Sequence, residues 1–324
     1  MVIKVATIAS GLEAPIVALK QLKIPHEHVY SCDISPQCRE VIEMNFKPKI
    51  LDKDFTKVNV DNMPFADLVV TGVTCKSFSA IYHKEDKGIK AANGVEKMIH
   101  NFLKYIRVHK PSCFIFENVK GFMTSDGGNT LKYVLKKMEQ GGLYDVNYSI
   151  MNTLDHGLPQ HRKRLYIVGI LKSRLLPGKR WEPPPKRKNT PHILDILDKK
   201  QPRQELNGYN SNLISMIKKK HPDFDRKPYV CLLSQSAIKY ATPRFDVAPT
   251  LTASHARDTF ISTEHRRLNV NELYRLQGFP DSYKKHPSKS QAASMCGNTM
   301  SINVLVDLFK SIKKVSTVFE NKKS

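Results

Sequence analysis

The chain of 324 residues carries 52 Lys and Arg against 30 Asp and Glu, a net charge of +22 with neutral histidines, and 40% of its residues are hydrophobic. This apolar content can form a buried core and excludes a disordered basic tail. No apolar run approaches the roughly 18 residues that cross a bilayer, the first residues lack a signal-peptide pattern, and none of the six cysteines lies in a Cys-x-x-Cys pair. We therefore expect a soluble intracellular protein, cytoplasmic or nuclear, with no membrane partner, no metal and no disulfide scaffold.

The positive charge is unevenly distributed. Residues 1–172 carry 24 basic and 17 acidic side chains, a net of +7, whereas residues 173–324 carry 28 and 13, a net of +15. Any one lysine cluster, such as Lys218-Lys219-Lys220, could be ordinary solvated surface. Together the clusters indicate a polyanion-binding surface, because each phosphate contact releases condensed counterions.

The first half of the chain alternates short apolar runs with amphipathic stretches. Strands are expected at Val2–Ile8, His28–Cys32, Asp67–Thr71, Cys113–Glu117, Val146–Met151 and Leu165–Ile170. Helices are expected at Ala14–Leu22, Pro36–Asn45, Val95–Lys110 and Thr130–Gln140. Strands separated by helices predict an α/β fold with a doubly wound, mostly parallel sheet. Ligands of such sheets bind beyond the carboxyl ends of the strands.

After residue 172 the pattern changes. Residues 173–262 are basic and rich in Asn and Pro, with weak periodicity. They indicate a linker followed by a small, irregular second domain. Regular structure is expected again after Arg266, with helices at Val270–Leu276 and Ser301–Ile312.

Polar residues follow several strands at the ends where a ligand would bind. A turn at Ser10–Glu13 follows the first strand, Asp33 the second and Cys75 the third, while Glu117 ends its own strand. Each also has an ordinary explanation: any α/β domain needs such turns, and an isolated Cys is usually a small buried residue. A carboxyl at the lip of a buried sheet is desolvated, however, which should raise the pKa of Glu117. Cys75 and Glu117 could then act as nucleophile and acid.

A series of segments, in the right order and over nearly the whole chain, resembles the motifs of the DNA cytosine-5 methyltransferases. They are Ser10-Gly11-Leu12-Glu13-Ala14, Asp33, Asp54 within Lys53-Asp54-Phe55-Thr56, Thr74-Cys75-Lys76-Ser77-Phe78-Ser79, Glu117-Asn118-Val119, Gln160-His161-Arg162-Lys163-Arg164, Arg275-Leu276-Gln277-Gly278-Phe279-Pro280 and Gly297-Asn298-Thr299.

This resemblance implies a Rossmann-like methyltransferase domain at residues 1–172 and 263–324, with a target-recognition domain at 173–262. It implies S-adenosylmethionine as cofactor, double-stranded DNA as substrate, a monomeric enzyme and, as a further partner, a cognate restriction endonuclease. The implied cofactor-binding residues are Ser10, Gly11, Leu12, Glu13, Asp33, Asp54, Asn298 and Thr299. The implied DNA-binding residues are Lys76, Ser77, Gln160, Arg275 and Gln277.

The catalytic residues that the resemblance implies are Cys75, Glu117, Arg162 and Arg164. Cytosine C5 is a weak nucleophile, and a thiolate that adds to C6 makes C5 enamine-like. A neutral Glu117 would donate to N3, and the two arginines suit the cytosine carbonyl, a phosphate or the thiolate. Because C5 is unreachable inside a duplex, the base must be flipped out.

The chain departs from the family pattern at four places. Thr74 replaces a Pro, Lys76 replaces a Gln beside the nucleophile, Glu13-Ala14 replaces Gly-Gly, and Ala9 replaces the aromatic residue common before Ser-Gly. Three alternatives therefore stay open. They are a catalytically silent DNA-binding relative, a tRNA cytosine-5 methyltransferase, since one branch of this family acts on RNA, and a nicotinamide enzyme, which the absence of Gly-x-Gly-x-x-Gly disfavours.

Overall fold

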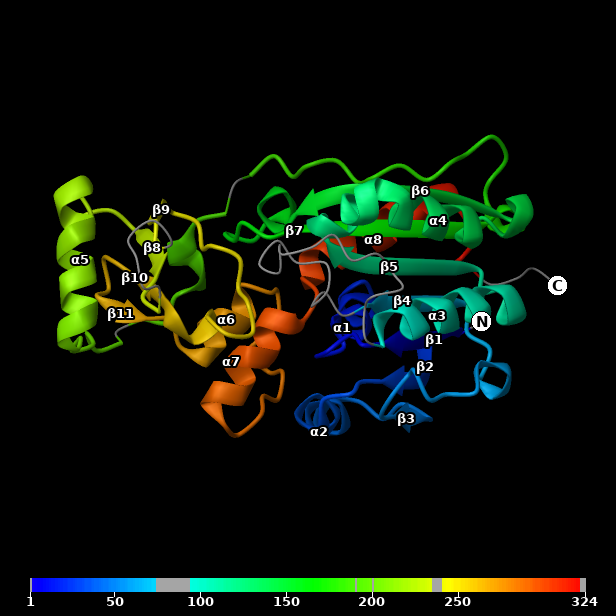
Figure 1. Ribbon diagram of the computed structural model, residues 1–324, viewed down its shortest axis with the longest axis horizontal. Helices are drawn as coiled ribbons and strands as arrows, with labels where there is room; N and C mark the ends of the chain where they lie inside the picture. Colours follow the sequence, from blue (N-terminus) through cyan, green and yellow to red (C-terminus); the bar gives the residue numbers. More distant parts are fainter. Residues whose placement is uncertain (1, 74–93, 190, 200, 235–240, 321–324) are drawn as a thin grey trace. The chain divides into compact units, whose positions relative to one another are not determined.

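The computed structural model describes residues 2–73, 94–189, 191–199, 201–234 and 241–320 (Figure 1). The chain divides into two compact units. Unit 1 comprises residues 1–151, 163–185 and 304–324, and unit 2 comprises residues 152–162 and 186–303.

Unit 1 is built on a large sheet whose strand order is β3-β2-β1-β4-β5-β7-β6. The strands are β1 (Ile3–Ile8), β2 (His26–Cys32), β3 (Leu51–Asp52), β4 (Leu68–Gly72), β5 (Cys113–Val119), β6 (Tyr144–Asn152) and β7 (Lys163–Leu171). Neighbours from β3 to β5 are parallel, whereas β7 is antiparallel to β5. The predicted α/β class with a mostly parallel sheet is confirmed.

Helices connect these strands as expected. They are α1 (Ala14–Gln21), α2 (Pro36–Asn45), α3 (Val95–His109) and α4 (Asn129–Met138), and α8 (Ile302–Val315) follows near the end of the chain. The start of α2 shows why the sequence folds this way: Ser35 Oγ accepts from the Cys38 N–H, and Pro36 occupies the first turn, where no N–H is needed.

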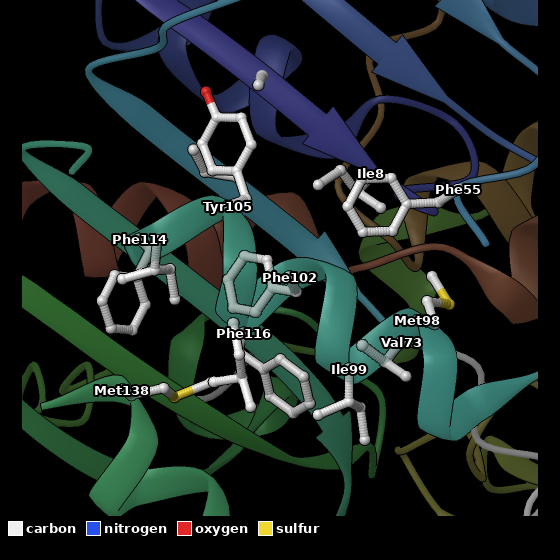
Figure 2. Packing of buried hydrophobic residues seen from close by; sticks show 14 of the residues in the cluster. Ile8, Phe55, Val73, Met98, Ile99, Phe102, Tyr105, Phe114, Phe116 and Met138 are labelled. Atoms are coloured by element: carbon white, nitrogen blue, oxygen red, sulfur yellow. The ribbon is translucent and has the colours of Figure 1, made fainter. Parts of the chain in front are cut away.

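The core beside α3 fixes this helix against the sheet. Figure 2 shows Phe102 of α3 next to Phe114 and Phe116 of β5. The ring centroids of Phe102 lie 6.0 Å from Phe114 and 5.8 Å from Phe116. All three side chains are fully buried, and Met138 of α4 joins the same cluster. The apolar face predicted for this helix is therefore the face that packs on the sheet.

Unit 2 contains more regular structure than its sequence predicts. A small antiparallel sheet has the order β11-β10-β8-β9. Its strands are β8 (Tyr229–Leu232), β9 (Arg244–Phe245), β10 (Thr259–Ile261) and β11 (Arg266–Arg267), and the helices of the unit are α5 (Gly208–Lys220), α6 (Val270–Arg275) and α7 (Lys289–Asn298). A core that includes Ile217 of α5, Phe224 and Phe260 joins α5 to the sheet. The expectation of an irregular segment was wrong for α5 and β8.

The compact units do not share the boundaries of the predicted domains. Residues 263–303 belong to unit 2, and residues 173–185 belong to unit 1. Compact units are defined by packing and the predicted domains by function, so the functional division at 173–262 stays a prediction.

Two further observations concern the described part of the chain. None of its helices combines the length and the apolar character that a bilayer span requires. Nor does it contain a group of three His, Cys, Asp or Glu side chains positioned to bind a metal ion.

Candidate active site

The first predicted cofactor residues form the turn between β1 and α1. Gly11 and Glu13 both have left-handed backbone conformations, with φ of 68° and 55°. The Gly11 N–H donates to Asp33 Oδ2 at 3.1 Å, so the structure brings the turn and the residue after β2 together. Ser10, Leu12 and Glu13 are buried at this turn.

Asp33 is a buried carboxyl at the carboxyl end of the sheet. Burial raises its pKa to about 6, while hydrogen bonds from the N–H groups of Ser35 and Gly11 act in the opposite direction and Glu13 adds to the rise. An ionised Asp33 has acceptor capacity left for a donor such as a sugar hydroxyl.

Asp54 lies in the loop after β3. Its Oδ1 accepts from Thr56 Oγ1 at 2.7 Å and from the Thr56 N–H at 3.0 Å, and these bonds lower its pKa. Asp54 lines a pocket of about 620 Å³ together with Tyr30 and Met63. Neither Gly11 nor Asp33 is among the described residues that line this pocket.

Two of the predicted catalytic side chains meet on neighbouring strands. β5 and β7 run side by side (Figure 1), and Glu117 and Arg164 sit two residues apart in their register. Arg164 Nε lies 3.4 Å from Glu117 Oε1, and both side chains are largely buried. A guanidinium at this distance orients the carboxyl and contributes positive charge beside it.

Arg162 belongs to unit 2, where its guanidinium donates to three backbone carbonyls. Its Nη1 donates to the carbonyls of Leu251 at 2.8 Å and Gly297 at 3.1 Å, and its Nη2 donates to Thr299 at 2.9 Å. Arg162 is 3% exposed. It therefore fixes the end of α7, where the predicted cofactor residues stand: Thr299 is buried and Asn298 is exposed.

Three predicted DNA-binding residues also have partners inside unit 2. Gln160 Nε2 donates to the Leu276 carbonyl, and Gln277 Nε2 donates to that of Cys296. Both glutamines are fully buried. Arg275 is paired with Asp198 and Asp281. These contacts hold the three side chains within unit 2, and their predicted DNA contacts stay a prediction.

The remaining predicted residues, Thr74, Cys75, Lys76 and Ser77, lie outside the described residues. The five described cysteines are all buried. Burial raises the pKa of each thiol, to about 12 for Cys32, Cys38 and Cys231, and further for the other two. A buried thiol with a raised pKa is a poor nucleophile at neutral pH.

Sequence reasoning missed the partners of the motif residues. Thr7 and Ser31 donate to the Glu13 carboxylate, and Asp198 binds Arg275. Thr7 and Ser31 are polar residues in the buried halves of β1 and β2, where the other side chains are mostly apolar, and this is a detectable signal. Asp198 is 77 residues from Arg275, and no spacing in the sequence links the two.

The chain is similar to known methyltransferases over most of its length. The profile of the C-5 cytosine-specific DNA methylase family matches residues 3–314. Type II methyltransferase M.HhaI of Haemophilus parahaemolyticus is 31% identical over 288 residues, covering 86% of this chain and 85% of that protein. Type II methyltransferase M.HaeII of Haemophilus aegyptius is 29% identical over 281 residues, covering 86% and 83%.

Solved structures share the fold at lower sequence identity. The S. pombe Dnmt2 methyltransferase superposes with a TM-score of 0.67 at 19% identity, covering 97% of this chain and 99% of that one. The Entamoeba histolytica methyltransferase EhMeth gives 0.68 at 16% identity, covering 97% and 98%. With a family match across nearly its whole length, the chain belongs to the C-5 cytosine-specific DNA methylases, enzymes that use S-adenosylmethionine as methyl donor.

Proposed function

We propose that this chain methylates C5 of a flipped-out cytosine in duplex DNA through a covalent bond between Cys75 and C6. The observation that carries the proposal is the contact between Arg164 and Glu117 on adjacent strands of unit 1. It places a carboxyl beside an orienting cation in a chain of the methylase family.

The residues at the β1 and β2 ends fit S-adenosylmethionine. Gly11 has no side chain to block a ligand at this turn, and the buried Asp33 carboxylate beside it can accept from ribose hydroxyls. Asp54, whose carboxylate is held by Thr56, can accept from an adenine amino group. When bound, the cofactor supplies an electrophilic methyl group.

The chemistry then follows from the protein groups. The Cys75 thiolate adds to C6 while Glu117 donates a hydrogen bond or proton to N3, so that the electron pair of the C5–C6 double bond becomes available at C5. C5 takes the methyl group. A base then removes the C5 proton, the C5–C6 double bond re-forms, the Cys75–C6 bond breaks and N3 returns its proton.

Cys75 is also the thiol best suited to this role by elimination. The chain has six cysteines, and the other five are buried with raised pKa values. Lys76 next to it would favour the thiolate.

Recognition of DNA is assigned to residues 173–262. This segment lies in the more basic part of the chain, and the exposed residues Lys219 and Lys220 at the end of α5 are suited to phosphate contacts. We further propose that the chain acts as a monomer and that, as the type II names of its relatives suggest, a restriction endonuclease of the same specificity accompanies it.

The proposal is tested by transfer of labelled methyl groups from S-adenosylmethionine to duplex DNA or to tRNA. The wild-type protein should label duplex DNA, and Cys75→Ala should label nothing. Cys231→Ala is the matched control, because it removes a buried thiol and should keep activity. Labelling of tRNA alone would favour an RNA substrate, and no labelling of either would favour a silent DNA-binding relative.

A further inference from the structure

The turn that carries Gly11 contains a side chain in an unusual position. Glu13 is a non-glycine residue with φ 55° and ψ 40°, a left-handed conformation that L-residues other than Asn and Asp seldom adopt. Its carboxyl is also fully buried at 0% exposure. Both features disfavour this residue at this site, so a specific interaction must offset them.

That interaction is made with two hydroxyl groups, one on β1 and one on β2. Glu13 Oε1 accepts from Thr7 Oγ1 of β1 at 2.8 Å and from Ser31 Oγ of β2 at 2.6 Å. The carboxylate therefore joins β1 and β2 through Oε1, while its Oε2 is buried without a hydrogen-bond partner among the described residues.

His28 extends the same network. Its Nε2 lies 2.9 Å from Thr7 Oγ1. Because the Thr7 hydroxyl proton is given to Glu13, Nε2 must carry the proton that Thr7 accepts. A neutral His28 fits this arrangement, because its Nδ1 is buried without a hydrogen-bond partner in the described part of the chain and burial lowers its pKa, although Glu13 acts in the opposite direction. The order of donation runs from His28 through Thr7 to Glu13.

The backbone of Glu13 has a second function. Its carbonyl accepts from the N–H groups of Ile16 and Val17 and so begins α1. Two residues earlier, the Gly11 N–H binds Asp33. A single residue thus connects the two strands, the first helix and the turn.

We propose that Glu13 is a positioning residue of the cofactor turn, whose carboxylate, held by Thr7 and Ser31, keeps this turn in the conformation in which Gly11 binds Asp33. The role assigned to Glu13 is thereby changed from direct cofactor contact to support of the residues that make it. The inference depends on the proposed function only in that Gly11 and Asp33 face S-adenosylmethionine.

The test is the dissociation constant for S-adenosylmethionine, measured by calorimetry beside kcat and the KM for DNA. Glu13→Ala should weaken cofactor binding about tenfold or more, since it removes hydrogen bonds to a charged group. The KM for DNA, and kcat at saturating cofactor, should change little. Glu13→Gln retains a carbonyl acceptor for Thr7 and Ser31, and should restore most of the affinity.

Matched variants separate this role from a general loss of folding. Lys110 has the same left-handed conformation, with φ 46°, but an exposed side chain, so Lys110→Ala should leave cofactor binding unchanged. Ser31→Ala should weaken cofactor binding in wild type and add little to Glu13→Ala. If Glu13→Ala does not fold, Ser31→Ala and Thr7→Val give the same test.

A pH profile adds a readout that a purely structural role would not change. The charges that face Asp33 are Glu13 and the guanidinium of Arg39, which act in opposite directions. Glu13→Gln removes one of them, and should move the acid midpoint of cofactor affinity to lower pH.

Three results would overturn the proposal: Glu13→Ala with wild-type cofactor affinity, equal losses in the Ala and Gln variants, or a loss in DNA affinity alone. A wild-type protein that binds no S-adenosylmethionine would instead overturn the assignment of the cofactor turn, and the positioning role with it.

Discussion

Arg164 Nε lies 3.4 Å from Glu117 Oε1, across the antiparallel pair formed by β7 and β5. The planar guanidinium restricts the directions in which the carboxyl can point. A cytosine placed for catalysis would need this carboxyl in one orientation, so the two side chains should act together on the rate.

Replacing Glu117 tests the acid. Glu117→Gln should lower kcat by about a hundredfold or more, because general acid catalysis contributes roughly that factor. The affinity for DNA should change less than the rate, since N3 activation strengthens in the transition state. Steady-state kinetics beside a DNA-binding titration checks this, and an equal loss in both would show that Glu117 serves binding alone.

Replacing Arg164 tests the orienting contact. Arg164→Lys keeps the charge but loses the planar fork, and should lower kcat without a large change in thermal stability. Combined with Glu117→Gln, its effect should be less than additive, because one residue acts through the other. Strictly additive losses in kcat would contradict the coupling.

Arg162 is expected to matter for stability. Arg162→Ala leaves the carbonyls of Leu251, Gly297 and Thr299 without this buried donor, and should cost about 3 kcal/mol of unfolding free energy. Arg257 is the control, because it is exposed and donates a long hydrogen bond of 3.4 Å to Ser290 Oγ. Arg257→Ala should change stability by less than about 0.5 kcal/mol. If Arg162→Ala and Arg257→Ala lowered the unfolding free energy equally in a denaturant titration, the stabilising role of Arg162 would be refuted.

The sequence predicted most elements of unit 1 and the helix α6 of unit 2, but it missed α5, α7 and the strands of unit 2. α2 occupies the predicted residues 36–45, because a capping Ser and a Pro mark its start and an apolar face marks its length. β3 has two residues and no periodicity to detect. The helix α5 was missed because polar and basic residues obscure its four buried positions.

For the candidate site, the sequence predicted residues better than it predicted their contacts. Glu117 and Arg164 were both predicted from short motifs, and the structure places them on the neighbouring strands β5 and β7. Gln277 was expected to reach DNA, but it binds Cys296 and Ser301 within unit 2. A motif identifies which residues matter, whereas the direction of a side chain depends on packing partners that are distant in the sequence.

Cofactor affinity should depend on pH through Asp33. Its pKa is raised on folding from 3.8 to about 6, chiefly by burial. In the protein without cofactor, the folded chain favours the protonated form of Asp33 more than the unfolded chain does. This carboxyl therefore adds to the free energy of unfolding below about pH 4, and the contribution is lost as the pH rises through about 6. A hydroxyl that donates to the carboxylate needs the ionised form.

S-adenosylmethionine should therefore bind more tightly as the pH increases from 5 to 7, with a midpoint near 6. Calorimetric titrations across this range measure it. Asp33→Asn should bind weakly with a flat profile, and an unchanged pH dependence in that variant would exclude Asp33 as its source.

DNA affinity should fall steeply with salt. Each phosphate that a lysine neutralises adds roughly one to the slope of log affinity against log salt. Lys219→Ala with Lys220→Ala should reduce the slope by about two, whereas Lys136→Ala with Lys137→Ala, on α4 of unit 1, should leave it unchanged. If the DNA affinity of the wild-type protein did not change with salt, Lys219 and Lys220 would be ordinary surface residues without phosphate contacts.

Bisulfite sequencing of plasmid DNA from cells that express the protein tests the central claim most directly. It reports activity, the base that is modified and the target sequence in one measurement. Wild-type protein should protect cytosine in one sequence context, and Cys75→Ala should protect none. Protection by Cys75→Ala, or unprotected DNA from cells that contain folded wild-type protein, would contradict the account.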